Sequence, residues 1–262
     1  MLSKVFKYDI KALRKTVISL CVVLLSVGTV GFGLQLLTDM LSARGDGLAL
    51  FGLYGFLLLV GVAIVGLLAA GGIAILYRYY RSVFTDEGYL TMTFPVGTHA
   101  LLLGKMLAAA LLALLLAAVA ALAYFLAFLL PELLDLLRLG VTEDLFSLLI
   151  GDLSYFLPED PLAVSLSVVS GFSTAVKELV LLYAAITLGA TVWKRAKVIG
   201  AFLFVFLISV CDSLLSTLLS LLPAVSQSAA LSYALSASLS LLVTVIFYFL
   251  TYLLLYKKFN IE

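Results

Sequence analysis

The chain has 262 residues, of which 64% are hydrophobic and only 12% are charged, and its formal net charge is +1. Its mean hydropathy is +1.23, whereas only about half of the residues of a soluble domain are apolar. This composition excludes an ordinary soluble globular protein and predicts an all-α protein that crosses the membrane several times.

Residues 1–16 combine basic side chains with apolar residues at helical spacing. The basic residues are Lys4, Lys7, Lys11, Arg14 and Lys15. This pattern is typical of an amphipathic helix in the headgroup layer of an anionic leaflet, and it also fits a topology signal with no other role. The next 21 residues, 17–37, carry no charge and exceed the length of a signal-peptide core, so we expect them to stay in the protein as its first span.

Six apolar segments each meet the requirement of about 20 residues for crossing the hydrocarbon core. They cover residues 17–37, 48–76, 101–130, 168–193, 198–222 and 229–256. Because no sequence repeat and no second domain are visible, we expect a single transmembrane domain over residues 1–262. Six spans, an even number, place both termini on one side of the membrane.

The loop at residues 77–100 is the most polar stretch between two of these spans. Thr85 can cap a short helix, with Asp86 and Glu87 in its first turn, where the helix dipole favours negative charge. Pro95 excludes one continuous helix through the loop. We therefore predict a short acidic helix held parallel to the membrane by the spans on either side.

Three pieces of sequence in and after this loop resemble one known family. They are RYYRSVFTDEGYL (78–90), TFPV (93–96) and LLLGK (101–105). They look like the cytoplasmic coupling loop of ABC-2-type ABC transporter permeases, the exporter class, in a Firmicutes-like form. In that family the loop docks into a groove on a separate ATP-hydrolysing subunit. The alternative is a solvated loop whose acidic residues only aid solubility.

The resemblance implies the partners and the site residues. The residues that would touch the ATPase are Thr85, Asp86, Glu87, Gly88, Tyr89 and Leu90. The expected assembly holds two copies of the ATPase, which bind ATP and Mg, and a second permease subunit that is either identical or a sister chain. The chain itself is expected to carry no cofactor, to lie in the lipid bilayer of the bacterial plasma membrane and to bind no nucleic acid.

The outer connection at residues 131–165 is too long for a turn and too apolar for a disordered linker. Its segments LLDLLRLG and DLFSLLIGDLSYFL are predicted to form two amphipathic helices. We expect a small helical cap that lies on the outer leaflet, and that either gates an exit or shields the bundle.

Three ionisable residues, Lys177, Glu178 and Asp212, fall inside apolar segments. Lys177 and Asp212 lie about 24 and 21 Å from the cytoplasmic ends of neighbouring antiparallel helices, at 1.5 Å per residue. Because an unpaired charge is costly there, one hypothesis is an ion pair between Lys177 and Asp212. In the other, Lys177 reaches outward to the membrane surface while Glu178 faces a watery cleft.

The basic residues predict the orientation, because they concentrate in cytoplasmic segments. Thirteen of the 16 lie in the N-terminal segment, the 77–105 region, the connection around residue 195 and the C-terminal tail. Only Arg44 and Arg138 lie in the opposite loops, which are rich in Asp and Glu. Both termini and the 77–100 loop are therefore expected to be cytoplasmic.

The chain lacks the GxxxxGK[ST] phosphate loop of an ATPase, so any ATPase must be a separate polypeptide. Its one histidine, His99, stands without a metal-ligand cluster or a nucleophile, so we expect an interface residue and no enzymatic activity.

The favoured function is the permease subunit of an ABC-2-type exporter for an amphipathic or hydrophobic substrate. One alternative is a secondary, proton-coupled transporter that uses Glu178 and Asp212, although the missing inverted repeats speak against it. Another is a membrane sensor or immunity protein that does not transport. An ABC importer permease also has a docking loop, but the basic N-terminal segment and the TFPV and LLLGK pieces favour the exporter.

Overall fold

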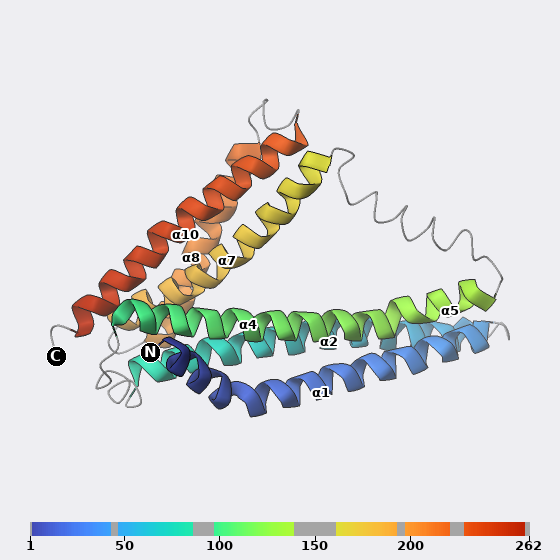
Figure 1. Cartoon of the computed structure of the whole chain (residues 1–262). Helices are drawn as coiled ribbons and strands as arrows, with labels where there is room; N and C mark the ends of the chain where they lie inside the picture. The colour runs from blue at the N-terminus through green and yellow to red at the C-terminus, as the bar shows by residue number, and fades with distance from the viewer. Residues whose placement is uncertain are drawn as a thin grey trace. The chain divides into compact units, whose positions relative to one another are not determined.

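The computed structural model describes residues 2–42, 47–85, 97–138, 161–192, 197–220 and 228–259. Within these ranges all regular secondary structure is helical, which confirms the all-α prediction. Figure 1 shows the elements, which are α1 (Leu2–Ser42), α2 (Gly47–Phe84), α4 (Thr98–Tyr124), the π-helical segment η1 (Phe125–Leu129), α5 (Leu130–Arg138), α7 (Pro161–Val192), α8 (Lys197–Ser220) and α10 (Ala229–Phe259).

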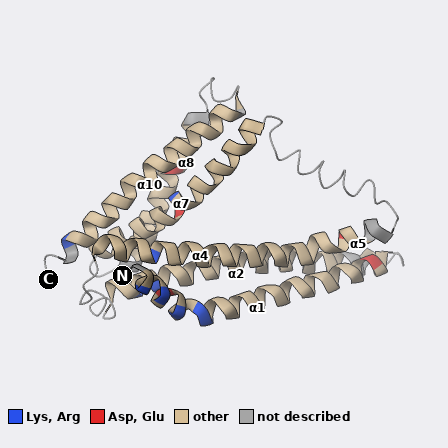
Figure 2. Ribbon diagram, in the orientation of Figure 1, with Lys and Arg blue, Asp and Glu red and all other residues tan. Residues whose placement is uncertain are grey.

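Six helical runs in the described residues are long and apolar enough to cross a membrane, one in each predicted segment. Their mean hydropathy lies between 1.6 and 2.7. This supports a multi-pass membrane protein with six spans. Figure 2 shows that the charges gather toward helix ends, with the basic residues of α1 at its N-terminal end.

The first helix is much longer than one span. At 1.5 Å per residue, the 41 residues of α1 extend for about 60 Å, twice the thickness of the hydrocarbon core. Residues 2–16, predicted as an elbow helix, are helical and continuous with the first span in α1, which runs from Leu2 to Ser42. The reason is local: nothing between residues 14 and 20 is a glycine or proline that would end a helix.

The third span also continues beyond its predicted end at residue 130. The chain passes from α4 through η1 into α5, so the first predicted cap helix is an extension of the span. Pro131 explains the π-helical turn, because its ring has no N–H and would clash with the carbonyl group of Ala127 in a regular α-helix. The wider turn lets Leu130 donate to the carbonyl of Phe125 instead. Residues 139–160 of the predicted cap lie outside the described residues, and its last residues, 161–165, belong to α7.

The chain forms two compact units. The N-terminal unit comprises residues 7–75 and 111–152, and the C-terminal unit comprises residues 1–6, 76–110 and 153–262. In the N-terminal unit, α1 approaches α4 and η1 closely at two glycines. A Cβ atom on Gly28 would lie 2.8 Å from the carbonyl oxygen of Ala123, and one on Gly31 would lie 2.6 Å from the Cβ of Ala127. Small residues thus allow these helix backbones to meet.

In the C-terminal unit, α7 is the central helix. In its most apolar 18-residue stretch 56% of the residues are buried, against 6% in α8 and 17% in α10. It packs against both α8 and α10. Its buried positions include Ala184, Ala185 and Gly189, whose small side chains allow close packing.

Helices α7 and α8 approach each other closely at Gly189. A Cβ atom there would clash with the backbone nitrogen of Ala201 and lie 2.5 Å from its Cα. No side chain fits that gap, and the obstacle is backbone that cannot rotate away. Glycine at 189 is therefore required for this helix crossing.

Helix α2 ends at Phe84, and the hydroxyl of Thr85 donates to the carbonyl of Arg81, 2.5 Å away. The predicted role of Thr85 as a cap for a following helix concerns residues outside the described ranges, as do Asp86, Glu87, Gly88, Tyr89 and Leu90. Helix α4 starts at Thr98, and the carbonyl of Gly97 accepts the first bond of this helix, from the N–H of Leu101.

Replacing Gly189 with Ala should destabilise the protein by about 1–3 kcal/mol, because the added methyl group overpacks the crossing of α7 and α8. Thermal unfolding of the purified chain measures this. The matched control is Gly171→Ala on the same helix, where a Cβ atom meets nothing within 4 Å. Equal stability of the two variants would contradict the crossing.

Candidate functional site

Polar side chains inside the C-terminal unit fall into two groups along α7. One group centres on Lys177 and the other on Tyr183 and Thr187. Lys177 and Thr187 are ten residues apart, which is about 15 Å along a helix. Both groups are described below from the contacts of their side chains.

Lys177 forms an ion pair with Asp212. Its amine nitrogen Nζ lies 2.6 Å from Oδ2 of Asp212 and 3.5 Å from Oε1 of Glu178. The side chain of Lys177 is only 8% exposed, that of Asp212 is 22% exposed, and that of Glu178 is 55% exposed. Of the two hypotheses from the sequence, the structure has the ion pair, and Lys177 does not reach outward.

The close crossing at Gly189 and Ala201 brings the pair together. Lys177 lies 12 residues before Gly189, or about 18 Å along α7, and Asp212 lies 11 residues after Ala201, or about 17 Å along α8. Because the two helices run antiparallel from this crossing, equal distances place the two side chains at the same level. Apart from Glu178 on α7 and Lys197 at the start of α8, these two helices carry no other charged residue.

The pair lets two charges, each unfavourable alone in an apolar environment, compensate each other. A lysine or aspartate inside a membrane is costly when unpaired, and breaking a buried pair by removing one partner typically costs about 3–5 kcal/mol. The short distance makes this a charge-assisted hydrogen bond as well as an ion pair. Glu178 offers the lysine a second, weaker partner.

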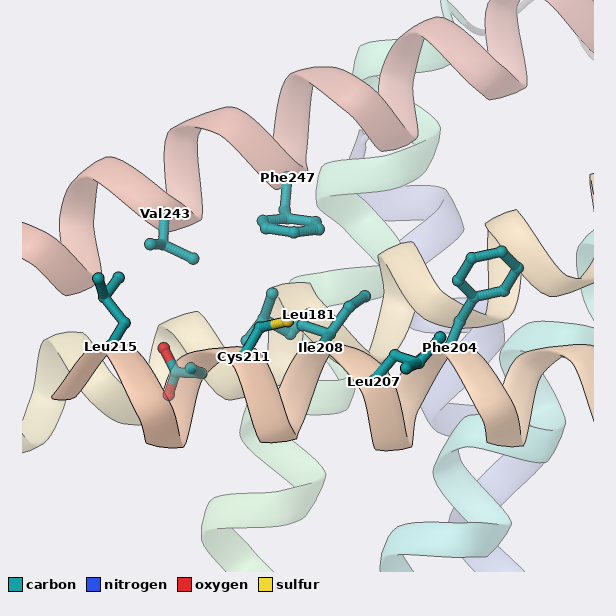
Figure 3. Close-up of a pocket in the computed structure, with 9 residues that line it drawn as sticks. Leu181, Phe204, Leu207, Ile208, Cys211, Leu215, Val243 and Phe247 are labelled. Atoms are coloured by element: carbon teal, nitrogen blue, oxygen red, sulfur yellow. The ribbon is translucent and has the colours of Figure 1, made fainter. Parts of the chain in front are cut away.

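A pocket of about 350 Å³ lies next to the ion pair. Its lining comprises Leu181, Phe204, Leu207, Ile208, Cys211, Asp212, Leu215, Val243 and Phe247. Figure 3 shows Val243 and Phe247 of α10 facing Cys211, Ile208 and Leu215 of α8 across it. Asp212 is the one ionisable carboxylate in an otherwise apolar lining, and Cys211 beside it is a free thiol.

The second polar group joins α2, α4 and α7. The buried amine of Lys105 on α4 donates to Oγ of Ser82 on α2 at 2.8 Å, and Ser82 in turn donates to the carbonyl of Tyr79. The hydroxyl of Tyr183 on α7 donates to the carbonyl of Lys105 at 3.3 Å. These bonds link the end of α2 to the start of α4, and both to α7.

Tyr79 makes a further link from α2 to α7. Its hydroxyl lies 2.9 Å from Oγ1 of Thr187. Since the Thr187 hydroxyl already donates to the carbonyl of Tyr183, Tyr79 is the donor of this bond. The rings of Tyr79 and Tyr183 also pack together, with centroids 4.0 Å apart. Tyr79, Thr187 and Lys105 are all at most 4% exposed.

Sequence reasoning missed this second group. The sequence predicted Lys105 only as a basic residue on the cytoplasmic side, whereas its side chain is buried. A signal was present, since Tyr183 and Thr187 are spaced by four residues and therefore share one face of their helix. The helix pattern could not show which partner that face meets.

His99, expected at an interface, stacks on Tyr252 with ring centroids 3.7 Å apart. Its Nδ1 also lies 3.2 Å from the hydroxyl of Tyr248. The start of α4 therefore packs against the end of α10. Among the described residues no group of three His, Cys, Asp or Glu side chains could hold a metal ion.

Comparisons with known proteins give no match: no family model, no curated protein and no solved structure is significantly similar to this chain. The contacts around α7 are therefore the structural basis for a functional proposal.

A double-mutant cycle tests the ion pair. Lys177→Met leaves Asp212 unpaired and should destabilise the protein by about 3–5 kcal/mol. Asp212→Asn should cost less, because Glu178 remains as a partner for the lysine. The double variant should be more stable than the sum predicts, with a coupling of about 0.5–3 kcal/mol in unfolding measurements.

Glu178→Gln is the control for this cycle, because the Glu178 side chain is 55% exposed. It should change the free energy of unfolding by no more than about 0.5 kcal/mol. Strictly additive effects of the Lys177 and Asp212 substitutions would show that the pair contributes nothing to stability.

Proposed function

We propose that this chain is the membrane subunit of an ABC-2-type exporter, powered by a separate ATPase. The observation that carries the proposal is the buried hydrogen-bond network at the base of the 77–100 loop. Lys105 and Ser82 tie the two ends of the loop to each other, and Tyr79 and Tyr183 tie them to α7. Such a base suits a loop that transmits force.

The network favours movement of the loop and α7 as one body. Each of its bonds is buried, and breaking a buried hydrogen bond leaves an unsatisfied polar group at a cost of about 1–3 kcal/mol. In the proposed mechanism, closure of the ATPase on ATP displaces the loop, and the loop displaces α7. The displacement then reaches the Lys177–Asp212 pair, about 15 Å further along the same helix.

The remaining parts of the proposal follow the resemblance to ABC-2 permeases. Two ATPase copies bind ATP and Mg, and two permease subunits, identical or sister chains, form the pathway in a bacterial plasma membrane. Residues Thr85 to Leu90 contact the ATPase from the cytoplasm. The chain performs no catalysis of its own. The basic N-terminal turns of α1 support a cytoplasmic N-terminus.

A proton-coupled transporter is the second candidate, and one observation favours it. Lys177 lies within 4 Å of two carboxylates, Glu178 and Asp212, so its partner can change. This mechanism needs no ATPase. Purification of the chain from its native membrane separates the two candidates, because the exporter should bring an ATPase with it and the proton-coupled transporter should not.

Reversing the loop charges tests the docking role directly. The double variant Asp86→Lys/Glu87→Lys should lose ATPase co-purification or ATP-driven transport, while membrane insertion stays normal, because it reverses the charge of two residues proposed to contact the ATPase. Glu132→Lys on α5 is the matched charge reversal outside the loop. Loss of ATPase binding in both variants, or in neither, would count against a docking role for the loop.

The base of the loop has a different expected phenotype. Lys105→Met or Ser82→Ala removes the bond that joins α2 to α4, so the ATPase should still co-purify while transport per ATP hydrolysed falls severalfold. Reconstituted vesicles measure both quantities. Thr244→Val, which also removes a hydroxyl but lies on α10 and bonds only within its helix, is the control.

A further inference from the structure

The pocket between α8 and α10 has the size and lining of a small-molecule site. Its 350 Å³ falls in the range of roughly 300–1,000 Å³ that such sites occupy, and its walls are apolar apart from Asp212. Two aromatic rings, Phe204 of α8 and Phe247 of α10, belong to the lining. The pocket therefore offers a broad apolar surface and one carboxylate.

The charges beside the pocket do not balance. Among the described residues, Lys177 is the one cation paired with the carboxylates of Asp212 and Glu178, so these three side chains carry a formal net charge of minus one. An uncompensated negative charge on membrane helices is unfavourable and attracts a positive partner. Asp212 holds Lys177 through Oδ2, and it also lines the pocket.

We propose that this pocket binds a lipophilic organic cation, with its apolar body against Phe204 and Phe247 and its positive charge at Asp212. The inference rests on the proposed transport function and names the substrate class of that function. Aromatic faces add to the attraction, since cations bind favourably over Phe rings.

Lys177 can give up Asp212 to the ligand because it has a second carboxylate nearby. Its amine is 2.6 Å from Asp212 and 3.5 Å from Glu178, so a small movement lets it pair with Glu178 while the ligand takes Asp212. No buried charge is left unpaired during this exchange. In this proposal Lys177 pairs with Asp212 when the pocket is empty and pairs with Glu178 when the cation enters.

Equilibrium binding to the purified full chain in nanodiscs tests the proposal, with protein-free nanodiscs as background. The probes are tetraphenylphosphonium and tetraphenylborate, which have nearly the same shape and opposite charge. We expect saturable binding of the cation and no saturable binding of the anion. Equal saturable binding of both, or none of the cation, would overturn the proposal.

Substitutions locate the binding. Asp212→Asn should weaken tetraphenylphosphonium binding by roughly tenfold or more, because it removes the charged partner. Lys177→Met should strengthen it, because it removes the competing amine. Glu132→Gln on α5, which also removes a carboxylate but does not line the pocket, is the matched control.

A second variant tests the same pocket in case Asp212→Asn does not fold. Val243→Trp fills the pocket from α10 and leaves the ion pair in place, and it should also abolish binding of the cation. Cation binding that survives both Asp212→Asn and Val243→Trp would place the ligand elsewhere and overturn the proposal.

The failures of the two proposals can be told apart. Absence of cation binding together with ATPase co-purification would reject the substrate class alone. Cation binding without any co-purifying ATPase would reject the exporter assignment alone.

Discussion

The crossing of α7 and α8 at Gly189 sets the geometry on which the interior charges depend. With only hydrogen at this position, the two backbones come together at Ala201, and the antiparallel helices then place Lys177 and Asp212 at one level. A charge inside a membrane needs a partner within bonding distance. A side chain at position 189 would separate the two helices near the crossing and move Lys177 away from Asp212. Gly189 therefore supports the ion pair.

Helix α7 connects two kinds of polar contact with its neighbouring helices in the C-terminal unit. At one level Tyr183 and Thr187 hold the ends of α2 and α4 through hydrogen bonds. At the other level Lys177 holds α8 through a charge. Because a helix is stiff along its axis over such a distance, displacement at one level is felt at the other. In the proposed exporter this stiffness would couple the loop to the pocket beside Asp212.

The long helices show how much of the outcome depends on local sequence. Pro131 does not end the third span, because the π-helical turn of η1 removes the clash and Leu130 donates to Phe125. Likewise, the change from a basic to an apolar sequence near residue 16 does not divide α1, since a change of polarity alone does not break backbone hydrogen bonds. Polarity predicts where a helix meets water, but not where it stops.

The sequence by itself determined the all-helical class, the six spans and the matching depths of Lys177 and Asp212, because hydrophobic length and rise per residue are properties of a single helix. Only the tertiary structure decided that Lys177 pairs with Asp212 rather than reaching the surface, that Lys105 is buried against Ser82, and that a pocket opens beside Asp212. Those outcomes depend on the rotation of each helix about its axis and on the distance between axes. Both are set by side-chain packing between helices, such as Gly189 against Ala201, and no periodicity within one helix encodes them.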